Sequence, residues 1–181
     1  VCRRQYVEEP ISICFLKAAA ADRVIAEGGY VPKPAEPTGK TVGVIGGGPA
    51  GLTAAYYLAL AGHDVTVVYA MPKMGGMLRY GIPAYRLPRD VIDAEVAEIA
   101  SLGVKMENGV HIGNDEAGRD FRAICDGEGF TKNISFDDFR KQYDAVIIAN
   151  GAWTSSSLRC EGDQLPGVWD GIDMLERVAL G

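Results

Sequence analysis

A glycine-rich turn that directly follows a short apolar strand constrains the fold of this chain more than any other feature. Residues 41–51 read Thr-Val-Gly-Val-Ile-Gly-Gly-Gly-Pro-Ala-Gly. Gly46, Gly48 and Gly51 have the G-x-G-x-x-G spacing, which serves a tight turn, close approach of a pyrophosphate to the backbone, and close packing of a helix on the strand. The helix expected over residues 50–61 adds free N–H groups and the positive end of its dipole. This stretch therefore predicts a dinucleotide-phosphate site.

The elements that follow extend this turn into an α/β fold. Residues 64–70 form a second apolar, β-branched run, so that strand, helix and strand make one β-α-β unit. Residues 88–102 have the periodicity of an amphipathic helix. Residues 144–150 are a continuous apolar run, typical of a parallel strand covered on both faces. The predicted fold class is α/β, with a Rossmann-like parallel sheet.

The remaining segments are assigned by pattern and by turn residues. A short helical segment is expected between Pro10 and Gly28, followed by a linker, so that we divide the chain into residues 1–37 and 38–181. Residues 104–112 alternate like one or two short strands around Asn108-Gly109, which is a hairpin-type turn signal. The other expected segments are a long functional loop at 71–87, a surface insertion at 116–133, a short capped helix at 135–142 and a terminal helix from about residue 170.

Composition excludes several classes of partner. Eighteen basic and 24 acidic residues give a net charge of −6, which offers no long-range attraction to nucleic acid or to an anionic membrane surface. The apolar runs are shorter than the roughly 20 residues that a membrane span needs. We therefore expect no nucleic acid, no membrane and a cytoplasmic location. Four scattered cysteines form no C-x-x-C site. The chain does not begin with methionine, so we expect a piece of a longer protein or a processed product.

Four sequence motifs carry a resemblance to a known family. They are Val-Ile-Gly-Gly-Gly-Pro-Ala-Gly-Leu at 44–52, Gly-Gly-Met-Leu-Arg-Tyr-Gly-Ile-Pro-Ala-Tyr-Arg-Leu-Pro at 75–88, Asp-Ala-Val-Ile-Ile-Ala-Asn-Gly-Ala-Trp at 144–153 and Leu-Pro-Gly-Val at 165–168. The chain resembles the FAD domain of the glutamate synthase small-subunit family, which includes the flavin domain of dihydropyrimidine dehydrogenase. This resemblance implies that residues 38–181 bind FAD, that an NAD(P)H domain follows, and that residues 1–37 end a helical domain that ligates [4Fe-4S] clusters.

The resemblance also implies site residues. Those implied to contact FAD are Gly46, Gly47, Gly48, Pro49, Ala50, Gly51, Tyr69, Ala70, Gly76, Met77, Leu78, Arg86, Ile112 and Gly151. Cys2 matches the last cysteine of a cluster-binding run whose partners lie upstream. One cysteine does not hold a [4Fe-4S] cluster, which needs four thiolates or equivalents.

Two departures from the family pattern keep a second interpretation open. Tyr69 stands at the end of the second strand, where a carboxylate is expected to hold ribose hydroxyls, and Asn150 stands where the family has threonine. No nucleophile–base set or carboxylate pair stands out, so no catalytic side chain is assigned. The leading interpretation is an NAD(P)H-dependent flavin oxidoreductase domain that passes electrons between nicotinamide, flavin and clusters, with the remaining domains or a complex partner as its partners. The alternative is a non-catalytic flavin-fold module with a structural or docking role; direct NAD(P) binding at the glycine turn is disfavoured by the 71–87 loop.

Overall fold

The computed structural model describes residues 2–113, 132–157 and 159–181. The chain divides into two compact units, Val1–Pro32 and Lys33–Gly181. The division predicted from the sequence, residues 1–37 and 38–181, stays a prediction.

The first unit is helical. It contains a 3-10 helix, η1 (Arg3–Tyr6), and the helix α1 (Ile13–Ala26), which confirms the helix expected between Pro10 and Gly28. Its apolar side chains are exposed: Phe15 is 78% exposed and Leu16 is 62% exposed. No residue of η1 or α1 is buried.

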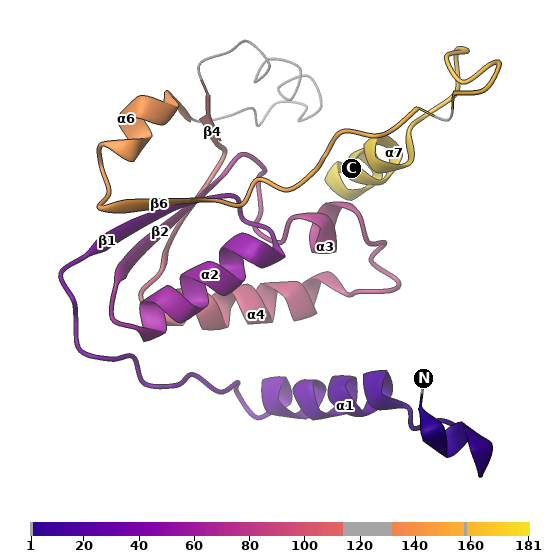
Figure 1. The fold of residues 1–181 in the computed structure, drawn as a ribbon, viewed down its shortest axis with the longest axis horizontal. Helices are drawn as coiled ribbons and strands as arrows, with labels where there is room; N and C mark the ends of the chain where they lie inside the picture. Colours follow the sequence, from indigo (N-terminus) through magenta and orange to yellow (C-terminus); the bar gives the residue numbers. More distant parts are fainter. Residues whose placement is uncertain (1, 114–131, 158) are drawn as a thin grey trace. The chain divides into compact units, whose positions relative to one another are not determined.

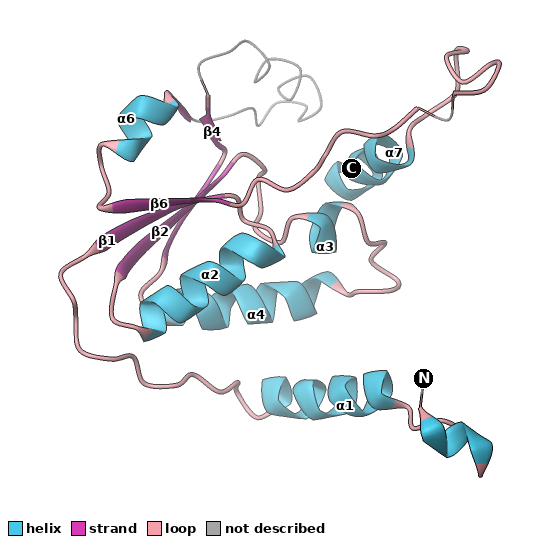
Figure 2. Ribbon diagram, in the orientation of Figure 1, coloured by secondary structure: helices cyan, strands magenta, loops and turns pink. Residues whose placement is uncertain are grey.

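The second unit is built on a four-stranded parallel sheet in the order β3-β2-β1-β6 (Figure 2). All three neighbouring pairs are parallel, which confirms the predicted α/β class. The β-branched composition of the two inner strands suits a pleated surface buried on both faces. The strands are β1 (Thr41–Ile45), β2 (Asp64–Tyr69), β3 (Lys105–Asn108) and β6 (Ala145–Ile148).

Helices cover the two faces of this sheet (Figure 1). On one face, α2 (Pro49–Leu60) and α4 (Arg89–Ser101) pack on alternate residues of β1 and β2, such as Val44 and Val67. On the other face, Phe139 of α6 (Phe136–Arg140) packs against Val68 and Val146. Because successive residues of a strand point to opposite faces, one short strand supplies both cores.

The predicted hairpin around Asn108-Gly109 is wrong. Gly109 adopts φ +68° and turns the chain, but the strands on its two sides lie in different sheets. β3 pairs with β2, whereas β4 (Val110–Ile112) pairs in parallel with β5 (Lys132–Ile134). Each of the two strands therefore pairs with a strand distant in the sequence, and not with the strand across the turn. Of the insertion predicted at 116–133, residues 116–131 lie outside the described residues.

The expectation that both faces of the 144–150 strand are covered is also wrong. β6 is the edge strand of the sheet, and Ile148 is 62% exposed. A run of apolar residues predicts a strand, but whether helices pack on each of its faces depends on elements elsewhere in the chain. The helix predicted at 135–142 is confirmed as α6, where the Ser135 hydroxyl accepts from the Asp138 backbone N–H.

The long loop and the terminal helix complete the second unit. The 71–87 loop contains a short helix, α3 (Met77–Tyr80), that contacts both α4 and α7. The predicted terminal helix is confirmed as α7 (Gly171–Leu180). Among the described residues, no helix is long and apolar enough to cross a membrane.

Candidate functional site

The glycine turn lies at the carboxyl end of β1, and two of its glycines are required by the protein's own backbone. Gly46 has φ +119°, and a Cβ there would overlap the Ala149 carbonyl at the end of β6. A Cβ on Gly51 would overlap the Gly46 carbonyl oxygen, because α2 starts directly over the strand. The Gly46 N–H donates to the Val68 carbonyl at 2.9 Å, which fixes the turn on β2.

Gly48 is different, because a side chain there would clash with no atom of the described residues. A Cβ on Gly48 would meet the Gly76 Cα at 3.7 Å, an ordinary van der Waals distance, and no nearer atom of the described chain beyond its immediate neighbours. Its φ of −86° is open to any residue. The space beside Gly48 therefore fits the role in which a glycine lets a ligand approach the backbone.

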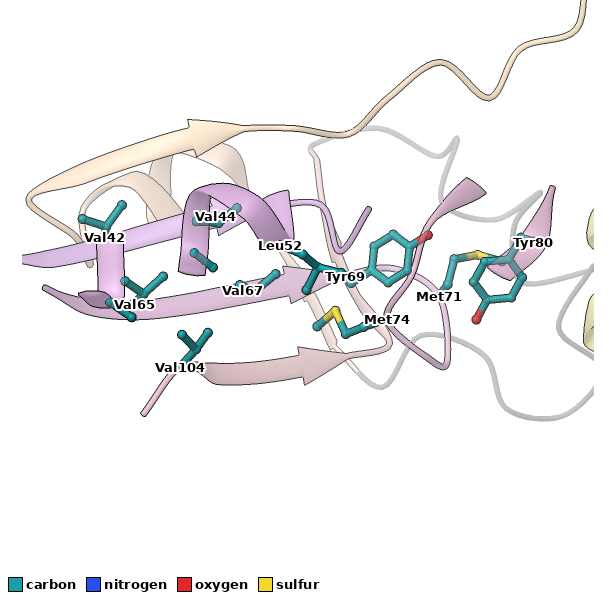
Figure 3. Packing of buried hydrophobic residues seen from close by; sticks show 12 residues of the cluster. Val42, Val44, Leu52, Val65, Val67, Tyr69, Met71, Met74, Tyr80 and Val104 are labelled. Carbon is teal, nitrogen blue, oxygen red and sulfur yellow. The ribbon is translucent and has the colours of Figure 1, made fainter. Parts of the chain in front are cut away.

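A second glycine pair packs against this turn. The Gly75 N–H donates to the Gly47 carbonyl at 2.8 Å, and Gly76, with φ +55°, approaches so closely that a Cβ on it would lie 2.5 Å from the Gly48 Cα. Met77 and Leu78 follow directly, at the start of α3 and half-buried. Figure 3 shows Met74 and Tyr69 beside each other in the cluster beneath the turn.

Arg79 holds this second loop in place. Its side chain is 6% exposed, its Nε donates to the Met74 carbonyl at 2.7 Å, and its guanidinium pairs with Asp93 of α4. Because this buried guanidinium has both a carbonyl and a carboxylate partner, the Arg79 side chain is held in one position and links the loop to α4.

The N-terminus of α2 offers backbone donors. No side chain caps it and no acidic residue lies in its first turn; Gly48 is the N-cap and Pro49 comes first in the helix. The N–H groups of Ala50 and Gly51 have no intrahelical acceptor by their position in the first turn. Together with the helix dipole, they suit an anion such as a diphosphate.

Tyr69 ends β2 directly under the turn, since a Cβ on Gly47 would lie 2.8 Å from its Cγ. Its side chain is 7% exposed, and its hydroxyl is buried with no hydrogen-bond partner in the described chain. Burial raises the pKa of this phenol, and the nearby Tyr80 and Glu176 add to the rise. Ala70 follows it and is half-buried.

Four of the predicted site residues are not found beside the two glycine turns in the structure. Arg86 is exposed, Ile112 ends β4 in the second, two-stranded sheet, and Gly151 has φ +70° in the exposed segment after β6. Cys2 lies in the first unit as a free cysteine, and the backbone around Ile11 and Arg4 lowers the pKa of its thiol. The described residues contain no group of three or more His, Cys, Asp or Glu that could hold a metal ion. The assignments of these four residues stay predictions.

Sequence reasoning missed Glu176, the most buried residue of α7. It is 5% exposed, and one of its carboxylate oxygens is buried without a hydrogen-bond partner in the described chain. Burial raises its pKa, Asp173 adds to the rise, and Arg177 opposes it. A signal was present, because Glu176 interrupts the apolar series of Ile172, Leu175, Ala179 and Leu180 at helical spacing.

These residues fit a dinucleotide cofactor. The approach at Gly48 is open, backbone donors stand at the start of α2, and a polar atom without a partner is buried at the end of β2. The last observation is the least expected of the three, because buried polar groups normally have partners.

Comparison with known proteins agrees with this geometry. Residues 40–179 match the family model of the pyridine nucleotide-disulphide oxidoreductases. The chain is 35% identical to the beta subunit of an NADP(+)-dependent formate dehydrogenase from Moorella thermoacetica, over 92% of this chain and 25% of that protein. It is 34% identical to the small chain of an NADPH glutamate synthase from Mycobacterium tuberculosis, over 93% and 31% of the two chains.

Two further comparisons bear on the resemblance and on the fold. A subunit PreT homolog of NAD-dependent dihydropyrimidine dehydrogenase from Salmonella typhi is 32% identical, over 97% of this chain and 38% of that protein. The structure of the oxidoreductase FprA from M. tuberculosis superimposes with a TM-score of 0.60 at 21% identity, over 78% and 28% of the two chains, which supports the fold.

The resemblance drawn from the four sequence motifs is thus confirmed. The chain spans about a quarter to two-fifths of the length of these relatives. The match covers nearly all of the second unit, including both glycine turns. The chain therefore belongs to the pyridine nucleotide-disulphide oxidoreductase family.

Proposed function

We propose that residues 38–181 form the FAD-binding part of an NAD(P)H-dependent oxidoreductase that passes electrons between nicotinamide, flavin and iron–sulfur clusters. The observation that carries the proposal is Gly48, whose Cβ position is clear of the protein at the point where a pyrophosphate would approach the backbone. The family supports an oxidoreductase, and the named relatives include enzymes of NADP(+), NADPH and NAD.

The roles of the chain's own residues follow from their positions. The backbone from Gly46 to Gly51 holds the pyrophosphate, with the N-terminus of α2 as its electrostatic partner. Arg79 and Asp93 keep the Gly75-Gly76 loop against Gly48. Bound FAD would accept a hydride and release electrons singly. The protein's part is binding and orientation, so that no side chain is assigned to proton transfer.

One observation favours the alternative of a non-catalytic flavin-fold module. The end of β2 carries the buried phenol of Tyr69 in place of a carboxylate, which removes the charged ribose acceptor expected there. In that case the domain would serve as a structural or docking part of a larger electron-transfer complex.

The flavin spectrum of the full-length protein separates these alternatives. A stoichiometric flavin absorbance that is bleached by NADPH or NADH without oxygen supports the oxidoreductase. Purified protein that lacks flavin, and takes none up from excess FAD, contradicts it and favours the docking module. Flavin that is bound but not bleached by either nucleotide supports the FAD site and contradicts the electron-transfer role.

Partners and location are proposed on the same basis. We propose that the chain works with further domains of its own protein or with an electron-transfer complex partner, in the cytoplasm, and without nucleic acid or a membrane. The net charge of −6 supports the absence of polyanionic partners. The full-length protein would hold [4Fe-4S] clusters, with Cys2 as one ligand.

A further inference from the structure

Helix α7 buries an acidic side chain, that of Glu176, and one of its carboxylate oxygens has no hydrogen-bond partner in the described chain. Glu176 lies on the inward face of α7, whose Ala179 and Leu180 pack against the same buried cluster that contains Tyr69. Its side chain is 5% exposed and its Oε1 accepts no hydrogen bond there. Glutamate is rarely buried without a partner because desolvating its charge is costly. The position therefore calls for a group that the described residues do not provide.

The Tyr69 hydroxyl is a second unpartnered polar atom of the same interior. Figure 3 shows its ring at the end of β2, within the cluster. The charge of Glu176 contributes to the raised pKa of Tyr69, so the two groups lie within electrostatic reach of each other. One of these two polar atoms thus comes from β2, inside the buried cluster, and the other from α7, the helix whose Ala179 and Leu180 pack against that cluster.

Arg79, near Tyr69, and Arg177, near Glu176, already have partners. Arg79 donates to the Met74 carbonyl and pairs with Asp93. Arg177 pairs with Asp173 at 3.3 Å, and its guanidinium lies 4.7 Å from the centre of the Trp169 ring. Neither guanidinium donates a hydrogen bond to Oε1 of Glu176, so this oxygen is left for another donor.

The place of these two atoms in the fold indicates what that donor is. In doubly wound dinucleotide-binding domains, a carboxylate about 20 residues beyond the glycine turn, at the end of the second strand, holds the ribose hydroxyls. Here that strand ends in a phenol, and the nearby carboxylate comes from α7. A ribose offers two adjacent hydroxyls, which would donate to the carboxylate and exchange a hydrogen bond with the phenol.

We propose that Glu176 supplies, from α7, the ribose-binding carboxylate that β2 lacks, with the Tyr69 hydroxyl as its companion. This inference rests on the proposed dinucleotide function. Both atoms are closed to solvent in the structure. Ligand entry must therefore part α7 from the end of β2, and α7 then closes on the ribose.

The test compares nucleotides that differ only in the ribose. ADP, 2′-deoxy-ADP and 3′-deoxy-ADP are titrated calorimetrically into the flavin-free full-length protein, whose nicotinamide-nucleotide site is first saturated with NAD(P)+. The wild type is expected to bind ADP about tenfold or more tightly than either deoxy form, the size expected for a hydrogen bond to a charged group. Glu176→Gln, nearly equal in shape, is expected to lose most of this preference. Asp173→Asn, one turn of α7 away and paired with Arg177, is the matched control and keeps it.

The outcomes separate this inference from the proposed function. If Glu176→Gln keeps the wild-type preference for ADP, the inference is overturned while FAD binding stands. Equal affinity of the wild type for all three nucleotides overturns it without any variant. A wild type that binds neither FAD nor ADP overturns the proposed function and the inference together. Rescue of the preference by Glu176→Asp in place of Glu176→Gln would identify the charge as the essential property.

Discussion

Gly48 and Gly51 belong to one motif, yet the structure gives them opposite roles. A Cβ on Gly48 meets only ordinary contact, whereas a Cβ on Gly51 overlaps the Gly46 carbonyl oxygen. We expect Gly48→Ala to change the free energy of unfolding by less than about 0.5 kcal/mol. The same substitution is expected to weaken FAD binding at least tenfold, about 1.4 kcal/mol, because the methyl group occupies the pyrophosphate's approach. Urea denaturation and flavin fluorescence titration measure the two effects.

Gly51→Ala is the matched control for that pair of measurements. It should lower the free energy of unfolding by about 1–3 kcal/mol, since α2 must shift away from β1 to accept the methyl group. Gly48→Ala protein with unchanged FAD affinity would contradict the pyrophosphate assignment.

Tyr69→Glu is the substitution for which sequence and structure give different expectations. From sequence, a carboxylate at this strand end should tighten FAD binding, because hydrogen bonds to charged groups contribute about 1.5–3 kcal/mol and neutral ones about 0.5–1.5 kcal/mol. In the structure, the new carboxylate would stand within electrostatic reach of Glu176. We therefore expect Tyr69→Glu to weaken FAD binding alone and to tighten it in a Glu176→Gln background.

Flavin fluorescence titration of the four proteins in this cycle measures the coupling. A Tyr69→Glu protein that binds FAD more tightly than the wild type would show that the two carboxylates do not interact. Tyr69→Phe serves as the control for loss of the hydroxyl alone, and it leaves the buried ring in place.

For single residues, the sequence predicts only those roles that depend on near neighbours along the chain. The glycines of the turn are recognisable because their spacing along the chain determines their spacing in the fold. Glu176 is recognisable as an anomaly in an apolar face, but Tyr69, whose pKa its charge raises, lies more than 100 residues earlier in the chain. No local sequence pattern connects the two residues, so only the structure shows that both belong to the same buried part of the fold.

Among the elements, β1 and β6 are tied at their starts by one carboxylate. Asp144 accepts from the Thr41 backbone N–H at 2.9 Å, and Lys40 Nζ donates to it at 3.1 Å. The Thr41 backbone and the Lys40 ammonium hold the pKa of Asp144 below its ordinary value of 3.8. The folded state therefore binds this proton less tightly than the unfolded chain does. The stability from Asp144 is fully present above pH 3.8 and is lost as the pH falls through the lowered folded-state value.

Asp144→Asn is expected to reduce the loss of stability in that acid range and to lower stability at pH 7. Urea midpoints measured at several pH values between neutral and acid give both effects. Asp22→Asn, on α1 in the other unit, is the control and should change neither. An acid dependence that is identical in Asp144→Asn and wild type would exclude this tie between the strands.

The elements also show where sequence patterns stop being informative. The β-α-β unit was predictable because one strand, one helix and one strand follow each other and pack together. The hairpin was wrong because Asn108-Gly109 specifies a turn but not the partners of the flanking strands, which are β2 and β5. The exposure of β6 was missed for the same reason, since cover is supplied by distant chain segments.

For the whole molecule, the two units predict independent folding of the larger one. The buried clusters of the second unit contain no residue before Val42. Removing residues 1–32 is therefore expected to change the free energy of unfolding of residues 33–181, measured by urea denaturation, by less than about 0.5 kcal/mol. A 14-residue helix is marginal alone in water, so a peptide of the first unit should show little helicity by circular dichroism. A large loss of stability on truncation would contradict the division.

The pairing of β1 with β6 determines how late in synthesis the parallel sheet can finish folding. Val42 pairs with Val65 but also with Ala145. One side of β1 is therefore paired early in synthesis, and the other side waits until about 80 further residues after Val65 have been made. Closing so long a loop is slow, because its entropy must be lost before the contact repays it. During that interval the nascent β-α-β unit exposes a bare strand edge, the kind of edge that recruits foreign strands. Folding yield should therefore depend on how quickly the ribosome delivers β6, and on chaperones that shield β1 until then.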